Sequence, residues 1–378
     1  MVDKSAIVIG AGICGLATAR ALAVRGYKVT VIEKNEKAIG ASIRNFGMIW
    51  PIGQPDGNLY EAAMSSRRIW KEVCDEAAIW YEEAGSLHLA YADDEWTVLN
   101  ELADIYSHRG YELLSPEDVC ARSPVTIREA LKGGLYSSQE LIVDPRVAMA
   151  RIPKWLSKKY GVTLLFGKTV IDIAYPYVFI GTEQFEADEI YVCSGADFET
   201  LYPDIYKEQP ITKCKLQMMR MEKQQNRIGP ALCGALSLAH YSSFKAASSL
   251  LILKKRFEEE YEALLQYGIH VMVSQNEIGE LTIGDSHEYG LTHEPFDRSL
   301  INQMILDYLK KFARFENEQI IETWNGIYPK LTDGNSLLVL EPESGVTIIN
   351  GLGGAGMTLS FGFCEQLFTN RKSLTVNV

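Results

Sequence analysis

The 378-residue sequence has few of the features that mark secreted, membrane or nucleic-acid-binding proteins. Its seven cysteines are an odd number and none stands in CxxC spacing, which argues against a disulfide framework. Asp and Glu number 49 against 37 Lys and Arg, and the formal net charge of -12 disfavours nucleic acid and anionic membranes as partners. We therefore expect a cytoplasmic protein with reduced thiols, in which an anionic substrate would meet a local basic pocket.

Long apolar runs and low-complexity tracts are also missing. The stretch that comes closest to a membrane span, residues 6–24, contains three glycines, Thr18 and Arg20; an acidic residue precedes it, and no small-residue cleavage site follows it. These features argue against both a membrane span and a signal peptide. With 47% hydrophobic residues, the chain is expected to be globular throughout and long enough for two cores.

Residues 6–33 have the pattern of a strand, a helix and a second strand. Gly10 allows a tight turn out of the first strand, Gly12 leaves room for a pyrophosphate, and Gly15 lets the helix and the strand pack closely. The helix N-terminus stabilises phosphate charge, and Glu33 ends the second strand, where a carboxylate can accept both ribose hydroxyls of an adenosine. A glycine-rich turn in any α/β protein is the alternative, but the complete unit favours a dinucleotide site.

The rest of the chain alternates between helical and strand-like periods. Helices are expected at 58–84, 93–110, 146–160 and 296–315, with Ser115 as the N-cap of a further helix and Asp144-Pro145 opening the third of these. Strands are expected at 87–90, 162–166, 169–173 and 189–196, and then, in a strand-like region, at 213–220, 250–253, 269–273 and 281–283. The second group of strands predicts an antiparallel domain.

A second glycine cluster at 351–358 follows a strand at 346–350 and opens the last helix near Met357. Two glycine-rich helix N-termini at opposite ends of one chain suggest one large cofactor held from both sides, which a nicotinamide dehydrogenase would not require. An unrelated C-terminal turn is the alternative. The small residues around Ser42 suit a loop that closes over a pyrophosphate and an isoalloxazine ring, although a surface loop would have the same composition.

These patterns predict an α/β fold in which an FAD-binding Rossmann-like domain is interleaved with an antiparallel-sheet substrate domain. We assign residues 1–90, 145–210 and 325–378 to the first domain, and residues 91–144 and 211–324 to the second.

The chain resembles the D-amino-acid oxidase and glycine oxidase superfamily of FAD-dependent amine oxidoreductases. The resemblance covers almost the whole chain and rests on residues 10–33, 42–48, 194–196, 324–334 and 351–358. More narrowly, residues 44–51, 268–276 and 283–288 resemble a bacterial branch associated with phosphonate catabolism, whose proposed substrates are aminophosphonates related to 2-aminoethylphosphonate.

The resemblance implies a set of residues that hold FAD. Glu33 would bind the adenosine ribose, the backbone of Val170 the adenine, and Gly353 to Thr358 the flavin pyrimidine edge, where N–H groups and a helix dipole stabilise the charge of the reduced ring. The full set is Gly10, Gly12, Ile13, Cys14, Gly15, Glu33, Lys34, Ser42, Asn45, Phe46, Gly47, Val170, Ser194, Gly195, Gly353, Gly354, Ala355, Gly356, Met357 and Thr358. Because no cysteine falls in 324–334, where related sarcosine oxidases attach their flavin, we expect non-covalent FAD.

The substrate side departs from the resemblance at Tyr328. Amino-acid oxidases of this superfamily usually carry an arginine at this position, before the proline, that clamps the substrate carboxylate. Without the bidentate hydrogen bonds of this arginine, a carboxylate substrate would lose about 2–5 kcal/mol of binding free energy. A tetrahedral phosphonate, in contrast, suits a cluster of His, Lys and hydroxyl groups. Candidates for that cluster are Tyr328, Lys330, His270, His287 and Lys215, with Met48, His270 and Tyr328 expected to line the substrate face of the flavin.

Each candidate has a structural alternative. Alternation along 269–273 places His270 on the face opposite Ile269 and Val271, and we take the face of His270 as the flavin side. The alternative is that His270 is a core residue, as histidines in apolar strands more often are. Lys215 would equally suit a strand edge. His287 has no second histidine four residues on, so we expect no metal site.

The expected reaction is oxidation of a C–N bond in a small amine, by hydride transfer to flavin N5, hydrolysis of the imine to an aldehyde, and reoxidation by O2 or another acceptor. Two alternatives stay open. One is an FAD-dependent dehydrogenase of a D-amino or hydroxy acid that passes electrons to a quinone. The other is a non-catalytic flavin-binding protein.

Overall fold

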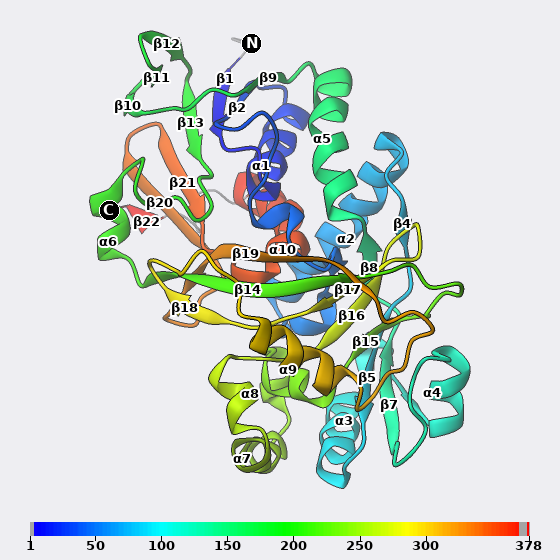
Figure 1. Cartoon of the computed structure of the whole chain (residues 1–378). Coiled ribbons are helices and arrows are strands. Elements are labelled where there is room, and N and C mark those ends of the chain that lie inside the picture. The colour runs from blue at the N-terminus through cyan, green and yellow to red at the C-terminus, as the bar shows by residue number, and fades with distance from the viewer. Residues whose placement is uncertain (1–3, 370–375, 378) are drawn as a thin grey trace.

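The computed structural model describes residues 4–369, 376 and 377, and this part of the chain is built on two large sheets (Figure 1). The first is seven-stranded, in the order β22 (Val376–Asn377), β20 (Leu338–Glu343), β21 (Val346–Asn350), β13 (Glu189–Val192), β1 (Ser5–Ile9), β2 (Lys28–Glu33) and β9 (Thr163–Phe166). From β21 to β9 every neighbouring pair is parallel, whereas β20 runs antiparallel to β21.

The central strands β1, β13 and β21 of this sheet are almost fully buried, and helices pack on the sheet. The helices on this part of the chain are α1 (Ile13–Val24), α2 (Asn58–Ala77), α5 (Pro145–Tyr160) and α10 (Gly356–Thr369). α10 packs on both α1 and α2, and a Cβ on Gly362 would lie only 1.9 Å from the carbonyl oxygen of Ala62. Only glycine therefore allows the C-terminal helix to lie this close to α2.

Three central strands end at the same edge of the sheet. Ile9 pairs with Val192, and Val192 pairs with Ile348, so the turns after β1, β13 and β21 lie side by side. Each turn contains a glycine with positive φ: Gly10, Gly195 and Gly351. In an open α/β sheet, ligands bind beyond the carboxyl ends of the strands, so the fold itself places a site here.

The second sheet is nine-stranded and mainly antiparallel, and it lies below the first in Figure 1. Its order is β18 (Glu288–Gly290), β14 (Ile211–Met221), β17 (Leu281–Gly284), β16 (Met272–Gln275), β15 (Ala231–Cys233), β5 (Ser86–Ala90), β7 (Gly133–Ser137) and β6 (Glu112–Leu114), with β19 (Ile320–Leu331) paired to β14. The helices of this region are α3 (Asp93–Ile105), α4 (Pro116–Arg122), α7 (Leu250–Glu260), α8 (Glu262–Gln266) and α9 (Ser299–Leu309). The long β14–β19 pair crosses the middle of the molecule between the two parts (Figure 1).

Two small sheets and one short helix complete the described part. They are the sheet β10 (Asp172–Ala174), β11 (Tyr177–Ile180) and β12 (Glu183–Glu186), the sheet β3 (Met48–Ile49), β8 (Leu141–Val143) and β4 (Tyr81–Glu82), and the helix α6 (Pro203–Glu208). β3 matters for the site because it holds the end of the loop around Ser42. The amide of Val143 donates to the carbonyl of Gly47 at 2.9 Å, which fixes that loop to β8.

The α/β fold class predicted from the sequence is confirmed, and so are several caps. The Ser115 hydroxyl accepts from the Asp118 amide at 3.2 Å, and the Asp144 carboxylate accepts from the first amides of α5. β5 and residues 325–331, which our division places with the FAD-binding part, are strands of the nine-stranded sheet. The division into two domains otherwise stays a prediction.

One predicted strand is wrong. Residues 250–253 begin helix α7, in which Leu250, Leu253 and Phe257 are buried while Leu251 is 72% exposed. The four consecutive apolar residues suggested a buried strand, but their burial follows the helical period. The carboxylate of Glu101 accepts from the amides of Ser248 and Ser249, just before this helix.

Some predicted elements are shorter than expected. The helix predicted at 58–84 ends at Ala77 because Ala78 is left-handed, with φ of 55°, and the helix predicted at 296–315 spans only Ser299–Leu309. The strand predicted at 169–173 is reduced to β10. No helix among the described residues has the length and apolar composition needed to cross a membrane.

Candidate functional site

The first cavity of the site lies at the edge where the parallel strands end and has a volume of about 700 Å³. Gly10 has φ of 103°, and a Cβ there would lie 2.4 Å from the carbonyl oxygen of Cys193. A Cβ on Gly15 would lie 1.9 Å from the carbonyl oxygen of Gly10. Gly10 and Gly15 therefore serve backbone packing, and Gly10 also lines the cavity together with Gly12 at the N-terminus of α1.

Glu33 lies in the same cavity at the end of β2 and is only 8% exposed. Its Oε2 accepts from the amide of Ala11 at 2.9 Å, and its Oε1 accepts from the amide and the side chain of Asn35, both at 3.0 Å. The carboxylate is thus held in place by the glycine-rich turn. Near it, Lys34 pairs with Asp197 at 2.7 Å.

The loop that carries Ser42 closes over the start of α1. The Ser42 hydroxyl accepts from the amide of Ile13 at 2.9 Å, so it caps a helix N-terminus that lines the cavity. Asn45 shapes the loop by donating to the carbonyls of Ala41 and Ser42, and its side-chain oxygen accepts from the amide of Gly47. Gly47 itself has φ of 73° and lies against β8.

A second cavity of about 620 Å³ adjoins the first. The two share a wall made of Ile13, Ala41, Ser42, Arg44, Tyr328, Leu352, Gly353 and Gly356. A Cβ on Gly353 would meet nothing within 4 Å, and one on Gly354 would meet only the Tyr328 ring, at 3.6 Å or more. The glycines before α10 thus leave space open where the two cavities meet.

The residues present fit FAD. The first cavity offers a helix N-terminus and a fixed carboxylate to a dinucleotide, and the second offers the glycine-rich start of α10 to a flavin ring. Of the predicted cofactor residues, Gly10, Gly12, Ile13, Cys14, Glu33, Lys34, Ser42, Val170, Ser194, Gly195, Gly353 and Gly356 line the first cavity, and Asn45, Phe46, Gly354, Ala355, Met357 and Thr358 line the second. Gly15 and Gly47 line neither cavity and act on the backbone instead.

The predicted substrate residues Met48, His270, His287, Tyr328 and Lys330 all line the second cavity. His270 lies two residues before β16, and the expected alternation places it and Met272 on the cavity wall, while Ile269 and Val271 are in the core. Lys215 is different. Its Nζ donates to the carbonyls of Glu294 and Phe296 at 2.9 and 2.7 Å, away from both cavities. Lys215 is therefore a structural residue.

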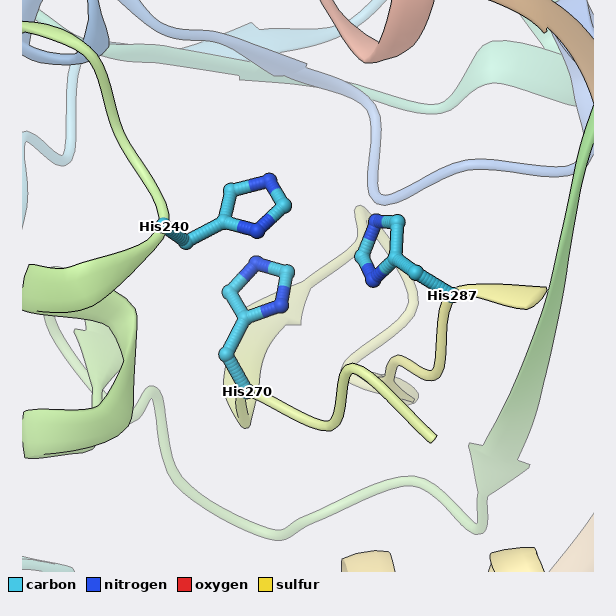
Figure 2. Close-up of side chains that lie close together, drawn as sticks. All are labelled: His240, His270 and His287. Atoms are coloured by element: carbon cyan, nitrogen blue, oxygen red, sulfur yellow. The ribbon is translucent and has the colours of Figure 1, made fainter. Parts of the chain in front are cut away.

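Three histidines meet on the wall of the second cavity. The rings of His240 and His270 are stacked, with centroids 3.8 Å apart and an interplanar angle of 9°, and the His287 ring lies 5.0 Å from His270 (Figure 2). His270 and His287 are buried, while His240, which follows a short 3-10 turn at Ala235–Ala239, is exposed to the cavity. We call His240, His270 and His287 the histidine cluster.

The histidine cluster is uncharged at neutral pH. Burial, together with a smaller effect of the positive charge of Lys330, lowers the pKa of His287 to about 4, although the hydrogen bond to the carbonyl of Gly268 opposes the shift. Burial also lowers the pKa of His270 well below the usual value, and the pKa of His240 is lowered in the same way because its ring, although open to the cavity, is surrounded by protein and repelled by the two neighbouring histidines. Neutral imidazoles keep one nitrogen lone pair each.

Asp285 is the acidic neighbour of the histidine cluster. Its carboxyl oxygens lie 3.4 Å from His270 Nδ1 and 3.8 Å from His287 Nε2, and burial raises its pKa well above the ordinary value. Among the described residues, the cationic side chains that line this cavity are Arg44, Lys245 and Lys330. The cavity thus has positive charge near a cluster of neutral imidazoles.

Sequence reasoning missed His240, Tyr241, Asp285, Arg44 and Lys245 as parts of this wall. His240 and Lys245 flank an irregular segment without strand or helix periodicity, so nothing in the sequence pointed to a site. Arg44 and Asp285 lie within residues 44–51 and 283–288, which carried the resemblance to the phosphonate-associated branch. Their place in these two stretches could have marked them as candidate site residues.

Comparisons with known proteins agree with this geometry. The sequence matches the family described as "FAD dependent oxidoreductase" over residues 5–369. It is 26% identical over 246 residues to the "tRNA 5-methylaminomethyl-2-thiouridine biosynthesis bifunctional protein" of Chromobacterium violaceum (61% of this chain, 36% of that protein). It is 24% identical over 251 residues to the D-amino acid dehydrogenase of Helicobacter pylori (51% of this chain, 60% of that protein). The match therefore spans less than two thirds of either relative.

Solved structures share the whole fold. Glycine oxidase of Bacillus cereus superposes with a TM-score of 0.76 at 18% identity, covering 98% of this chain and 96% of that one. L-proline dehydrogenase of P. horikoshii gives 0.77 at 20% identity (98% and 94%), and iminodiacetate oxidase of Chelativorans gives 0.72 at 17% (98% and 99%). With a family match over nearly the full length and two joined cavities that fit a flavin dinucleotide, this chain belongs to the FAD-dependent oxidoreductases of the D-amino-acid oxidase type, and FAD is its cofactor.

Proposed function

We propose that this enzyme oxidises the C–N bond of a small primary or secondary amine that carries a phosphonate group, such as 2-aminoethylphosphonate. FAD held in the two cavities would supply the acceptor for a hydride from the carbon next to the nitrogen, and water would hydrolyse the imine product to an aldehyde. The names of similar proteins support the proposal that the substrate is an amine. Glycine oxidase, iminodiacetate oxidase and D-amino acid dehydrogenase are all named for substrates with a C–N bond.

The observation that carries the phosphonate proposal is the wall opposite the glycines of α10. Tyr328 stands where the resemblance predicts a carboxylate-clamping arginine, and it is only 6% exposed. The same cavity holds the histidine cluster and Lys330. A phosphonate has three oxygens in tetrahedral arrangement and accepts donors from several directions, so a cluster suits it better than one planar fork.

Arg44 is the alternative partner for a carboxylate, since it lines both cavities. Its Nη1 already donates to the carbonyl of Asn325 at 3.0 Å, which removes one arm of a bidentate fork. Lys330 acts as a point charge instead, with its ammonium 5.5 Å from the centre of the Tyr289 ring. The free cationic groups thus favour a compact, highly charged anion over a planar carboxylate.

The apolar residues of the cavity position the rest of the substrate. Phe46, Met48, Trp50 and Met272 line the wall beside the polar groups. Their apolar surface makes this side of the cavity a poor solvent for a charged ammonium group, which favours the unprotonated amine that C–N oxidation requires.

A matched pair of substrates tests the proposal. Anaerobic bleaching of the enzyme-bound flavin is followed with 2-aminoethylphosphonate and with β-alanine, its carboxylate analogue. The expected kcat/KM ratio is about tenfold or more in favour of the phosphonate, because a missing ionic clamp is worth at least ~1.4 kcal/mol. Equal or faster reduction by β-alanine, glycine, sarcosine or a D-amino acid would reject the phosphonate part and leave amine oxidation standing.

We propose O2 as the acceptor of the electrons. Peroxide formed in step with substrate consumption supports an oxidase. Turnover that needs an added quinone and yields no peroxide would instead place the enzyme with dehydrogenases, such as the D-amino acid dehydrogenase to which it is similar.

A further inference from the structure

We propose that the histidine cluster is a metal site, in which His240, His270 and His287 bind one divalent ion of the zinc type and leave one coordination position open to the substrate cavity. The metal site stands on the geometry alone. Its role, to bind an oxygen of the substrate's phosphonate, rests on the proposed function.

The first argument is convergence. In the part of the chain that the structure describes, one ligand atom from each of these three histidines lies within 4.8 Å of the other two. Figure 2 shows the rings around one common space, with His240 and His270 on one side and His287 on the other. A tetrahedral zinc ion with bonds of about 2.05 Å needs nitrogens ~3.3 Å apart, so closing the set takes side-chain rotation, for which the exposed His240 has room.

The second argument is a pair of buried polar atoms that face one another without a hydrogen bond. His270 Nδ1 and Asp285 Oδ1 lie 3.4 Å apart, and neither has a hydrogen-bond partner among the described residues. Both side chains are more than nine-tenths buried. A native structure rarely leaves two such atoms unpaired, and an ion is one of the standard explanations.

The third argument is the tautomer of His287. Its Nδ1 lies 3.0 Å from the carbonyl oxygen of Gly268, which can only accept, so Nδ1 carries the proton. Nε2 therefore keeps its lone pair, and the nearest polar group on that side is the Asp285 carboxyl at 3.8 Å. A histidine whose second nitrogen donates to a backbone carbonyl is the usual arrangement of a metal ligand.

Asp285 completes the surroundings of the ion. In zinc sites, ligating histidines commonly donate to a carboxylate, and Asp285 could accept from His270 Nδ1, 3.4 Å away, when His270 binds the ion through Nε2. An ion in this place would also favour the charged form of that buried carboxyl, which otherwise lacks a cation in contact.

The charge of the cavity wall is the reason to expect that the ion contacts the substrate's anionic group. A divalent ion would add to the positive charges of Arg44, Lys245 and Lys330, which line the same cavity, so the wall would be strongly positive even with Asp285 ionised. A phosphonate carries up to about -2, like a phosphate monoester, and one of its oxygens suits the open fourth position of a three-histidine zinc site. An amino acid with one carboxylate charge would not balance it.

The type of ion follows from the donors. Three neutral imidazoles suit zinc, copper, iron and nickel, and exclude magnesium and calcium as preferred ions because those prefer oxygen ligands. Zn2+ is the probe of choice because it has no redox chemistry that could mimic flavin turnover.

The test uses the FAD-loaded full chain. Chelator-treated enzyme is titrated with Zn2+ in equilibrium dialysis, and bound metal and bound FAD are counted together. We expect one zinc per chain. His240→Gln and His287→Gln should each weaken zinc binding about tenfold or more, whereas His108→Gln, a change in an exposed histidine outside both cavities, should leave it unchanged.

Folding is controlled within the same experiment. His240 stands on an exposed turn, so its variant should keep its FAD and its Tm even where a variant of the buried His287 does not. Absence of zinc binding at 100-fold excess over enzyme, or equal binding by wild type and His240→Gln, would overturn the metal site.

The substrate role has its own readout. Removing zinc should raise the KM for 2-aminoethylphosphonate about tenfold or more and restoring it should reverse the change. An unchanged KM in zinc-free enzyme overturns the role of the ion while the proposed function survives. Zinc binding that depends on His240 in an enzyme that prefers β-alanine supports the metal site while the proposed function fails.

Discussion

Replacement of Glu33 by alanine should separate the two tasks of this carboxylate. Glu33 accepts three hydrogen bonds within the protein, one from the amide of Ala11 and two from Asn35. A carboxylate has about four acceptor positions, so roughly one remains, on Oε2, for a ribose hydroxyl. The sequence pattern predicted that Glu33 accepts from both ribose hydroxyls, whereas the structure leaves room for about one such hydrogen bond.

The magnitude follows from this count. One hydrogen bond to a charged acceptor is worth about 1.5–3 kcal/mol, so Glu33→Ala should raise the Kd for FAD about 10- to 100-fold. The same change leaves the buried amide of Ala11 and the partly buried amide of Asn35 without a partner, so the apoprotein should lose about 2 kcal/mol of unfolding free energy as well.

Two measurements are needed to tell the effects apart. Equilibrium dialysis with fluorescence of free FAD gives Kd, and thermal melts with and without FAD give the stabilisation that the cofactor adds, which falls by about 1.4 kcal/mol for each tenfold rise in Kd. Glu36→Ala, at an exposed position on the same loop, is the control. A less stable apoprotein with unchanged Kd would show that Glu33 only supports the glycine-rich turn.

Three further changes probe other parts of the molecule. His270→Ala should lower kcat/KM by roughly 2–3 kcal/mol with FAD content and Tm close to wild type, and a loss of flavin and stability at unchanged kcat/KM per flavin would place His270 in the core. Lys215→Met should cost about 2 kcal/mol in urea unfolding because two carbonyl acceptors lose their donor, and KM should not change, since Lys215 lies outside the cavities. Burial lowers the pKa of His88 to about 3. Because the unfolded chain binds this proton below pH 6.5 and the folded chain does not, stability should fall by about 2 kcal/mol between pH 6.5 and 4.5, and His88→Leu should flatten that slope in urea melts.

The dinucleotide half of the site could be predicted because its requirements are local. A Cβ on Gly10 or Gly15 would collide with backbone, and Glu33 must end the neighbouring strand. The local geometry thus requires these residues, and the sequence pattern predicts the geometry directly. The glycines before α10 differ, because a Cβ on Gly353 or Gly354 would project into open space or ordinary contact, but they too are local to one turn and one helix start. Such signals need no knowledge of distant contacts.

The substrate wall could not be predicted in the same way. His240 follows a 3-10 turn, His270 precedes β16, and His287 precedes β18, and these three segments meet only through the nine-stranded sheet. A search for histidines at helical spacing finds none of them. Residues 250–253 show the same limit, because a short apolar run has no period of its own until Leu251 is known to be exposed.

The acidic composition and the proposed anionic substrate are compatible once distance is considered. At physiological ionic strength charges are screened beyond about 8 Å, so the net charge of -12 hardly acts on a ligand already inside the cavity. There, the nearby groups decide, and those that line the cavity are Arg44, Lys245, Lys330 and the neutral histidine cluster. The imidazoles carry no positive charge of their own and therefore do not repel the ammonium group of Lys330. A metal ion or a proton bound by the histidine cluster would add positive charge when an anionic substrate binds. Selectivity for a doubly charged group can therefore arise in a protein whose surface repels it.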